Sequence, residues 1–187
     1  MVEYFTVKNF FTEQECDEIA NHSIENLKLE RGLIGLEARY DEKMRKSSVS
    51  MTSYDSTFPY IKNKLFNTIS NNIKIKGYEI SFENQPYQFT KYETGEYYNW
   101  HIDSFETGYM ASRYCSIVVQ LNDSYTGGDL QMQKDEDIIT FERGKGNLFV
   151  FLSSILHRVT TVTDGTRYSL VNWFTLKPVK DFKKTLI

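Results

Sequence analysis

The sequence has few of the residues that mark secreted and membrane-spanning proteins. Only two cysteines occur, Cys16 and Cys115, too few for a disulfide framework, and the core-type residues around each indicate buried free thiols. The first residues lack a basic region followed by an apolar run, so we expect no secretory signal peptide. No apolar run approaches the length that spans a bilayer. We therefore expect a soluble, cytoplasmic protein without a membrane partner.

Basic charge is also scarce, which lowers the expectation of nucleic-acid binding. Lysine and arginine number 22 against 25 acidic residues, for a net charge of −3, so the chain has no general attraction to a phosphate backbone. Aromatic residues are plentiful, with 13 Tyr and 13 Phe among 187 residues. Aromatic side chains fit the half-buried surface of a pleated sheet, and this length suits one domain with a sizeable core.

Two helices are predicted in the first part of the chain. Thr12 and Glu15 have the spacing of a capping box, and apolar residues recur behind them at helical spacing, which predicts an amphipathic helix over residues 12–29. A second helix is predicted over residues 57–72. Its apolar stripe consists of Ile61, Leu65, Phe66 and Ile69. Residues 45–54 alternate weakly, which favours an edge strand.

From Pro86 onward the hydrophobic period changes to two, which is typical of strands. The turn signals between apolar stretches are Thr94-Gly95, Thr126-Gly127-Gly128, Arg143-Gly144-Lys145-Gly146 and Asp164-Gly165. The expected strands cover residues 86–92, 97–103, 113–122, 128–133, 137–142, 146–152, 156–163 and 166–175. So many short strands favour a sandwich or barrel over a parallel α/β sheet. The predicted fold class is mainly β, with flanking helices on one outer face.

Two of the three histidines lie in strand-like segments. His101 and Asp103 are two residues apart, so on a strand their side chains would point to the same face. His157, from another predicted strand, can supply a third ligand. Two imidazoles and one carboxylate on one face leave three positions open, which suits non-haem Fe(II). We interpret His22, on the first helix, as solvated or capping and not as a ligand.

A lone His-x-Asp spacing is common in proteins, but a later arginine strengthens the metal hypothesis. Arg167 follows the Asp164-Gly165 turn, so it can enter the neighbouring strand on the side of the metal. A guanidinium there would pair bidentately with the distal carboxylate of a dicarboxylate. The alternative is a surface arginine that closes a hairpin. An inward-facing arginine requires an anion that compensates its charge.

The motifs around these residues resemble a known family. They are, in order, Gln88–Tyr98, His101–Asp103, Arg113–Ser116, Leu121–Asn122, Tyr125–Leu130, Gly146–Phe151, His157–Val159, Val162–Tyr168 and Trp173. Together they resemble the prolyl 4-hydroxylase-like branch of the 2-oxoglutarate oxygenases, particularly the compact microbial PKHD-type hydroxylases. The similarity covers residues 86–175, with a weaker echo upstream that includes Arg45–Ser47.

The resemblance implies a double-stranded β-helix, or jelly roll, with N-terminal helices packed on one sheet. Residues 1–187 would form one dioxygenase domain. Its parts would be helical support in 1–85, the β-helix core in 86–176 and a tail in 177–187. His101, Asp103 and His157 would be the iron ligands.

The resemblance also implies how the cosubstrate is held. Arg167 takes the place of the basic residue that binds the C5 carboxylate of 2-oxoglutarate, which is a lysine in many animal and plant relatives. Tyr92 and Ser116 match positions that donate to the same carboxylate. Trp173 resembles a tryptophan that lines the active site, and we place Arg113 and Tyr54 in the substrate pocket as well. Tyr92, Ser116 and Trp173 would equally suit the core of a barrel.

The implied activity is that of an Fe(II)- and 2-oxoglutarate-dependent oxygenase. It would use O2 to hydroxylate a C–H bond, with release of succinate and CO2 and with ascorbate as an optional reductant. The expected substrate is a prolyl residue in a peptide or protein. The alternatives are a free amino acid or other small metabolite, or a non-catalytic β-barrel that binds a partner. A nucleic-acid demethylase is disfavoured, because Trp173 stands where that group carries a second arginine. No oligomeric state is predicted.

Overall fold

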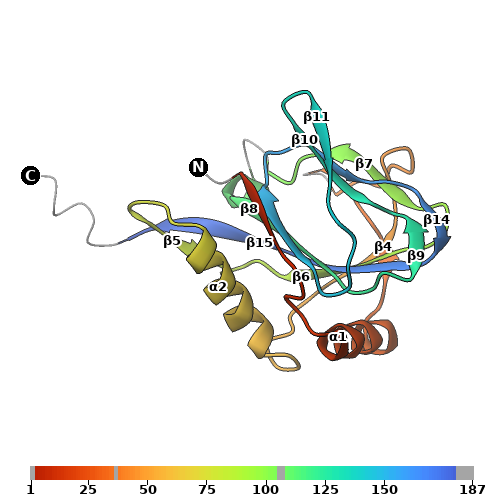
Figure 1. Cartoon of the computed structure of the whole chain (residues 1–187), viewed down its shortest axis with the longest axis horizontal. Coiled ribbons are helices and arrows are strands. Elements are labelled where there is room, and N and C mark those ends of the chain that lie inside the picture. The colour runs from red at the N-terminus through yellow and green to blue at the C-terminus, as the bar shows by residue number, and fades with distance from the viewer. Residues whose placement is uncertain (1–2, 36–37, 105–107, 180–187) are drawn as a thin grey trace, which may run out of the picture.

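The computed structural model describes residues 3–35, 38–104 and 108–179, and its described part consists mainly of antiparallel strands (Figure 1). The helices are α1 (Glu13–Asn26), α2 (Tyr60–Asn72) and a short 3-10 helix (Tyr109–Ser112). The strands of the first half are β1 (Tyr4–Val7), β2 (Glu30–Arg31), β3 (Arg45–Lys46), β4 (Ser48–Thr52), β5 (Tyr78–Ser81), β6 (Tyr87–Tyr92) and β7 (Tyr97–His101). Those of the second half are β8 (Cys115–Gln120), β9 (Tyr125–Gly127), β10 (Leu130–Lys134), β11 (Asp137–Thr140), β12 (Leu148–Leu152), β13 (His157–Val159), β14 (Val162–Gly165) and β15 (Arg167–Pro178).

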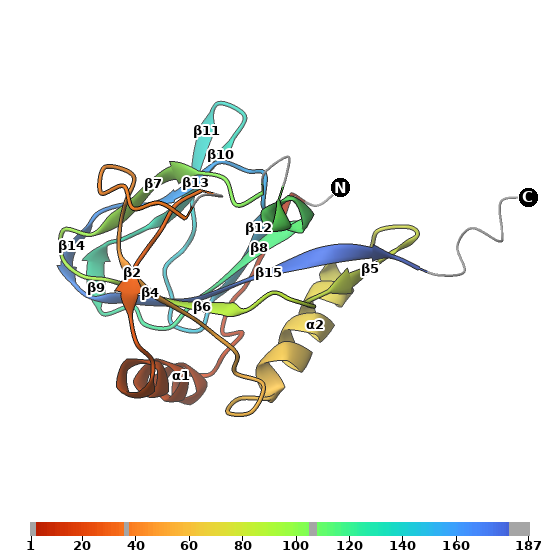
Figure 2. The same cartoon turned by 180° about the vertical axis from the view of Figure 1, so that it is seen from behind.

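The strands form two main sheets and one short pair. Within the described residues the large sheet has the order β1-β12-β8-β15-β6-β4-β2, with β5 paired to the far end of β15. The small sheet has the order β11-β10-β13-β7-β3, and β14 pairs with β9. Figures 1 and 2 show the small sheet facing the large one, with both helices on the opposite, outer side of the large sheet. The predicted fold class is confirmed.

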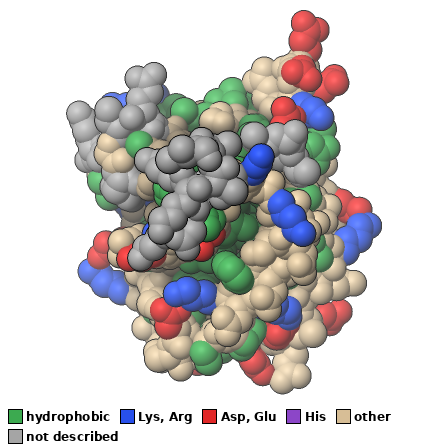
Figure 3. All heavy atoms as spheres, turned by 90° about the vertical axis from the view of Figure 1, so that its left-hand side faces the viewer, with side chains coloured by type: hydrophobic (Ala, Val, Ile, Leu, Met, Phe, Trp, Pro, Cys, Tyr) green, Lys and Arg blue, Asp and Glu red, His purple; other side chains and the backbone are tan. Residues whose placement is uncertain are grey.

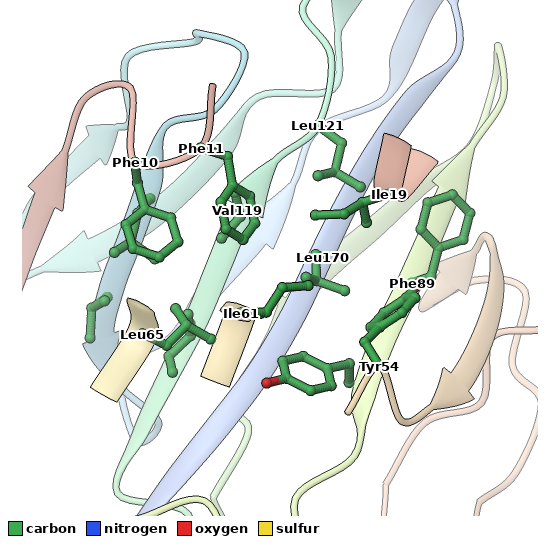
Figure 4. Close-up of a cluster of buried hydrophobic side chains, with 14 of the residues drawn as sticks. Phe10, Phe11, Ile19, Tyr54, Ile61, Leu65, Phe89, Val119, Leu121 and Leu170 are labelled. Carbon is green, nitrogen blue, oxygen red and sulfur yellow. The ribbon is translucent and has the colours of Figure 1, made fainter. Parts of the chain in front are cut away.

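The helices form as their sequences dictate and cover the large sheet. Thr12 caps α1: its hydroxyl accepts from Glu15 N at 3.1 Å, and the Glu15 carboxylate accepts from Thr12 N at 2.7 Å. This confirms the predicted capping box. Figure 4 shows apolar side chains of both helices against those of the strands, among them Ile19, Ile61 and Leu65. Burial of this layer is the main source of stability on this side of the sheet.

Phe66 departs from the prediction for the second helix. Its side chain is 44% exposed, whereas Ile61, Leu65 and Ile69 are buried. Phe66 lies one residue beyond Leu65, about 100° further round the helix, so it faces away from the sheet. The helix boundaries also differ from the prediction, because α1 ends at Asn26 and α2 begins at Tyr60.

The first half of the chain contributes strands as well as helices, so its prediction as helical support is incomplete. Residues 45–54 do not form one edge strand: β3 joins the small sheet and β4 the large sheet, with Ser47 between them. β4 pairs with β6 on one side and β2 on the other. The predicted strand over 156–163 is divided into β13 and β14.

The predicted C-terminal tail, residues 177–187, is in part a strand. Lys177 and Pro178, assigned to a tail, close β15 and pair with β5. Residues 180–187 lie outside the described residues. No helix within the described ranges is long and apolar enough to cross a membrane. On the face in Figure 3, acidic and basic side chains are interspersed, as on many protein surfaces.

Candidate metal centre

His101, Asp103 and His157 converge at one point between the two sheets. Their ligand atoms all lie within 4.8 Å of one another. His101 Nε2 lies 3.7 Å from Asp103 Oδ1, and His157 Nε2 lies 3.5 Å from Asp103 Oδ2. Each of the three side chains is buried or largely buried. Two imidazole nitrogens and one carboxylate form a donor set that fits Fe(II).

The two histidines meet because their strands are neighbours, whereas Asp103 arrives by another route than predicted. His101 on β7 is directly opposite His157 on β13 in the small sheet. β7 ends at His101, so Asp103 does not share a strand face with it. Asp103 lies in a bend whose backbone N–H donates to Ser153 O at 2.8 Å. The bend, and not the pleat, brings the carboxylate to the imidazoles.

Backbone carbonyls orient both imidazoles. His101 Nδ1 lies 2.8 Å from Asn99 O, and His157 Nδ1 lies 2.9 Å from Ile155 O. Because a carbonyl can only accept, the hydrogen of each neutral ring is on Nδ1, and Nε2 keeps its lone pair. Burial, with the nearby His157, lowers the pKa of His101 to about 3, so this ring is neutral at pH 7. Second partners of this kind are typical of metal-binding histidines.

The carboxylate of Asp103 is held by side chains of the large sheet. Its Oδ2 accepts from Ser116 Oγ at 2.7 Å and from Trp173 Nε1 at 2.9 Å. Burial would raise the pKa of Asp103, but His157, His101 and the hydrogen bond from Ser116 outweigh that effect and hold the pKa below its usual range. Asp103 is therefore an anion, the form that a metal requires.

A stacked aromatic ring also packs against one of the metal-site histidines, His101. Tyr98 on β7 lies parallel to the His101 imidazole, with ring centroids 3.4 Å apart and planes 11° apart. This contact restricts the rotation of the imidazole. The sequence prediction missed Tyr98 and Ser153, since neither a tyrosine in a strand nor a serine in a turn carries a signal of which distant residue it will contact.

Arg167 lies in the same cavity and is among the most buried side chains. It is 1% exposed, and its Nη1 donates to Ser169 Oγ at 3.0 Å. Its Nε and Nη2 have no hydrogen-bond partner among the described residues. Tyr92 lies directly opposite on β6, with the guanidinium carbon 5.4 Å from its ring centroid. A buried guanidinium cannot lose its proton, so this position requires an anionic ligand.

The route by which Arg167 reaches the cavity also differs from the prediction. After the turn the chain does not enter the neighbouring strand, because β14 pairs with β9 and β15 belongs to the large sheet. The side chain nevertheless points to the metal side. Arg167, Ser169, Val171 and Trp173 alternate along β15, and all four line the cavity.

Ser116 does not take the predicted position beside the cosubstrate arginine. Ser116 pairs with Trp173, whereas Arg167 is six residues away on β15, about 20 Å at 3.3 Å per residue. The Ser116 hydroxyl donates a hydrogen bond to Asp103 Oδ2. Its assignment to the cosubstrate carboxylate is therefore wrong, and its contact is with the metal ligand.

The predicted substrate-pocket residues divide into two groups. Trp173 and Arg113 line the cavity, with the Arg113 guanidinium carbon 3.6 Å from the Trp173 ring centroid. Tyr54 lies on the other side of the large sheet, as Figure 4 shows, and is 1% exposed in the helix-covered core. Its hydroxyl lies 2.5 Å from Ser23 Oγ. A pocket role for Tyr54 is therefore wrong. His22 packs edge-on against Tyr54 and Phe58, far from the metal ligands in the fold.

The cavity that contains these groups has a volume of about 540 Å³, within the range of small-molecule sites. His101, Asp103 and His157 lie on its wall, as do Arg167 and Tyr92. Apolar side chains complete it, namely Val118, Leu130, Val159 and Val171. A metal, an organic anion and part of a second molecule can be accommodated together.

Comparisons with known proteins agree with this geometry. The family model described as the 2OG-Fe(II) oxygenase superfamily matches residues 87–175. A PKHD-type hydroxylase of Rippkaea orientalis is 28% identical over 143 residues, which cover 73% of this chain and 63% of the relative. One of Acaryochloris marina is 33% identical over 86 residues, which cover 46% and 39%. The chain thus matches less than two thirds of the length of these curated relatives.

Solved structures with the same fold include two prolyl hydroxylases. The Trichoplax adhaerens prolyl hydroxylase, in complex with a peptide fragment of the oxygen degradation domain of hypoxia inducible factor, superposes with a TM-score of 0.78 at 17% identity, over 92% of this chain and 83% of that one. A Pseudomonas putida prolyl-4-hydroxylase gives a TM-score of 0.70 at 22% identity, over 92% of each chain. They confirm the jelly-roll fold. Over residues 87–175 the chain is similar to the 2OG-Fe(II) oxygenase superfamily, and the relatives and solved structures support its PKHD-type, prolyl 4-hydroxylase-like branch.

Proposed function

We propose that this protein is an Fe(II)- and 2-oxoglutarate-dependent oxygenase that hydroxylates a prolyl residue in a peptide or protein. The observation that carries the proposal is the meeting, in one cavity, of a two-histidine, one-carboxylate donor set and a buried arginine without an anionic partner. The names of the similar PKHD-type and prolyl hydroxylases support the choice of a prolyl substrate.

Each group in the cavity has a chemical task. His101, Asp103 and His157 hold the metal, with Ser116 and Trp173 fixing the carboxylate. Arg167 binds the distal carboxylate of 2-oxoglutarate, and Tyr92 is the candidate for a second donor to it. Fe(II) held there would supply the oxidation, in which 2-oxoglutarate and O2 are consumed: one oxygen atom would convert the C–H bond to C–OH, and the other would enter succinate with loss of CO2. The apolar side chains of the wall would limit the access of water to the reacting groups.

The decisive experiment measures succinate formation. Protein purified without metal is supplied with Fe(II), 2-oxoglutarate, ascorbate as reductant and a pool of proline-containing peptides. We expect succinate only when iron and 2-oxoglutarate are both present, together with a peptide product heavier by one oxygen atom in mass spectrometry. Failure to form succinate with any substrate pool would reject the enzymatic proposal and favour a non-catalytic interaction module.

The same assay separates the second candidate substrate class. The cavity has the volume of a small-molecule site, and this observation favours a free amino acid or other small metabolite as the alternative. A pool of free amino acids is therefore assayed beside the peptides. Oxygen incorporation into a free amino acid alone would replace the prolyl peptide as the assigned substrate and leave the oxygenase assignment intact.

A further inference from the structure

A second buried arginine lines the same cavity. Arg45, on β3, is 5% exposed, and its side chain lies among the cavity-lining groups together with His101 and Asp103. Its Nη2 is buried and has no hydrogen-bond partner among the described residues. Arg45 thus shares with Arg167 the two properties that point to an anionic ligand.

The rest of the Arg45 head group is held firmly. Its Nε donates to Ser47 Oγ at 2.7 Å, and its Nη1 donates to Leu33 O at 3.1 Å. The guanidinium carbon lies 4.5 Å from the centroid of the Tyr98 ring. On the other side is Gly32, where an added Cβ would come within 2.5 Å of both Arg45 Nε and Ser47 Oγ. The backbone leaves room for the guanidinium and for nothing larger than hydrogen.

The charge of this guanidinium is not compensated by the described residues. Its polar partners are a neutral hydroxyl and a neutral carbonyl, and no described Asp or Glu forms an ion pair with it. Arginine remains protonated even when buried. A buried charge without a counter-ion is costly, so the position is best explained by an anion that arrives from outside the protein.

The cosubstrate does not account for an anion at Arg45, because its two ends have other partners. Under the proposed function, one carboxylate of 2-oxoglutarate pairs with Arg167 and its other end lies at the metal. Arg45 is joined to the metal site through Tyr98, whose ring contacts Arg45 on one side and His101 on the other. An anion at Arg45 would therefore lie in the same cavity as the metal site but belong to a different molecule.

Resting on the proposed oxygenase function, we infer that Arg45 binds a carboxylate of the substrate. Only one nitrogen of the guanidinium lacks a partner, which suits a singly charged carboxylate better than a phosphate dianion. The carboxylate has two possible sources, the α-carboxylate of a free amino acid or small acid, and a carboxylate of a peptide. Neutral prolyl peptides would be poor substrates.

The binding site is tested without turnover, with acetate as the probe. Protein loaded with Zn(II), which is diamagnetic, and saturated with 2-oxoglutarate is titrated with acetate while the side-chain Nε–H signals of arginine are followed by NMR. The Arg45 signal is identified by its loss in Arg45→Gln. We expect the Arg45 signal to shift and saturate with acetate, because 2-oxoglutarate already pairs with Arg167. An unshifted Arg45 signal overturns the inference.

Two matched variants sharpen the titration. Lys46→Gln removes a positive charge from the next residue of β3, whose side chain is exposed and pairs with Glu42, and the Arg45 response should persist. Gly32→Ala keeps the charge but pushes the guanidinium away from its position. We expect the acetate affinity to fall at least tenfold. An acetate response that is equal in Gly32→Ala and the wild type contradicts a preorganised site.

The source of the carboxylate is identified by substrate pairs. Free amino acids, peptides with a free C-terminus, the same peptides with a C-terminal amide, and peptides with or without an acidic residue are compared for oxygen incorporation. Removal of the recognised carboxylate should lower kcat/KM about 100-fold in the wild type and only slightly in Arg45→Gln, as expected for a charge pair of about 2–3 kcal/mol. Equal use of the charged and neutral members of every pair overturns the inference.

The outcomes separate this inference from the proposed function. A normal requirement for iron and 2-oxoglutarate with no acetate response at Arg45 rejects the inference alone. An acetate response at Arg45 in a protein that never forms succinate supports the anion site and rejects the oxygenase assignment. The two conclusions thus stand or fall on different measurements.

Discussion

The two faces of the large sheet share the same strands but are built for opposite purposes. On β15, Leu170 and Phe174 point toward the helices and join the apolar core, whereas Arg167 and Trp173 point into the cavity. β8 alternates in the same way, with Ile117 in the helix-covered core and Ser116 bonded to Asp103. The strand period of two assigns successive residues to the two faces.

The two faces differ in how far their buried polar groups find partners within the protein. The helix-covered face is filled by hydrocarbon and aromatic groups, with the Tyr54 hydroxyl placed against Ser23. The cavity face keeps a buried carboxylate, two imidazoles and, on Arg45 and Arg167, nitrogens without hydrogen-bond partners among the described residues. Groups of that kind lower stability unless a ligand completes them. Substitutions on the helix side should therefore reduce stability, and those on the cavity side should reduce activity.

The strongest test of the contrast removes a metal ligand. His101→Ala should abolish iron-dependent succinate formation, because two remaining ligands cannot hold the metal. Its thermal unfolding without metal should stay close to that of the wild type, since His101 lies on the cavity side. Iron binding by calorimetry and succinate by mass spectrometry provide the measurements. Unchanged succinate formation would remove His101 from the ligand set.

A large effect of the opposite kind is expected from the helix side. Leu65→Ala should lower the free energy of unfolding by about 2–5 kcal/mol, because Leu65 is fully buried and a cavity would remain. The iron and 2-oxoglutarate requirements of the folded protein should not change. Phe66→Ala, next to it but exposed, is the control and should stay within about 0.5 kcal/mol. Equal effects of the two substitutions would contradict the packing described for α2.

Arg167→Met should separate activity from stability on the cavity side. Loss of the charged pair should raise the KM for 2-oxoglutarate about 100-fold while iron binding persists. Because the substitution replaces a buried charge that lacks an anionic partner by an apolar chain, the melting temperature without ligand should not fall. Steady-state kinetics and calorimetric scans check both statements. A KM equal to that of the wild type would assign the cosubstrate to another residue.

A smaller effect is expected where the two sheets meet at Asp103. Ser116→Ala removes one of the two hydrogen bonds to Asp103 Oδ2 and should weaken metal binding by about 10- to 100-fold. Ser70→Ala, on α2, serves as the control of the same chemistry away from the metal. If both variants bind iron as the wild type does, the orienting role of Ser116 is excluded.

The smallest effect concerns the cap of α1. Thr12→Ala removes the hydroxyl that accepts from Glu15 N and should destabilise the protein by about 1 kcal/mol. Urea unfolding measures this difference, and kinetic constants should remain at wild-type values. A midpoint equal to that of the wild type would show that the remaining half of the capping box suffices.

Local patterns predicted much of this molecule. The capping box at Thr12, the apolar residues of both helices and most strands after Pro86 follow from period and turn chemistry, which depend on residues close in sequence. The sequence also predicted that Arg167 and Trp173 lie on the same face of one strand, because they are six residues apart. These features need no knowledge of which strands pair.

Contacts between distant strands could not be predicted in this way. The sequence says nothing of the register that puts Ser116 opposite Trp173 and directs its hydroxyl to Asp103. Tyr54 was misassigned because its burial depends on which sheet face the helices cover. The motif echo at Arg45–Ser47 did not reveal that Arg45 is buried in the cavity, since that burial arises from Gly32 and Tyr98, which reach it from other segments.

The hydrogen bonds that hold Asp103 have a consequence for the opening of the fold. Both histidines belong to the small sheet, whereas Asp103 is fastened to Ser116 and Trp173 of the large sheet. A metal held by all three residues would therefore connect the small sheet to the large sheet. Release of the metal should weaken the contact between the two sheets. Amide hydrogens of β7 and β13 should then exchange with solvent sooner than those of the helix-covered core.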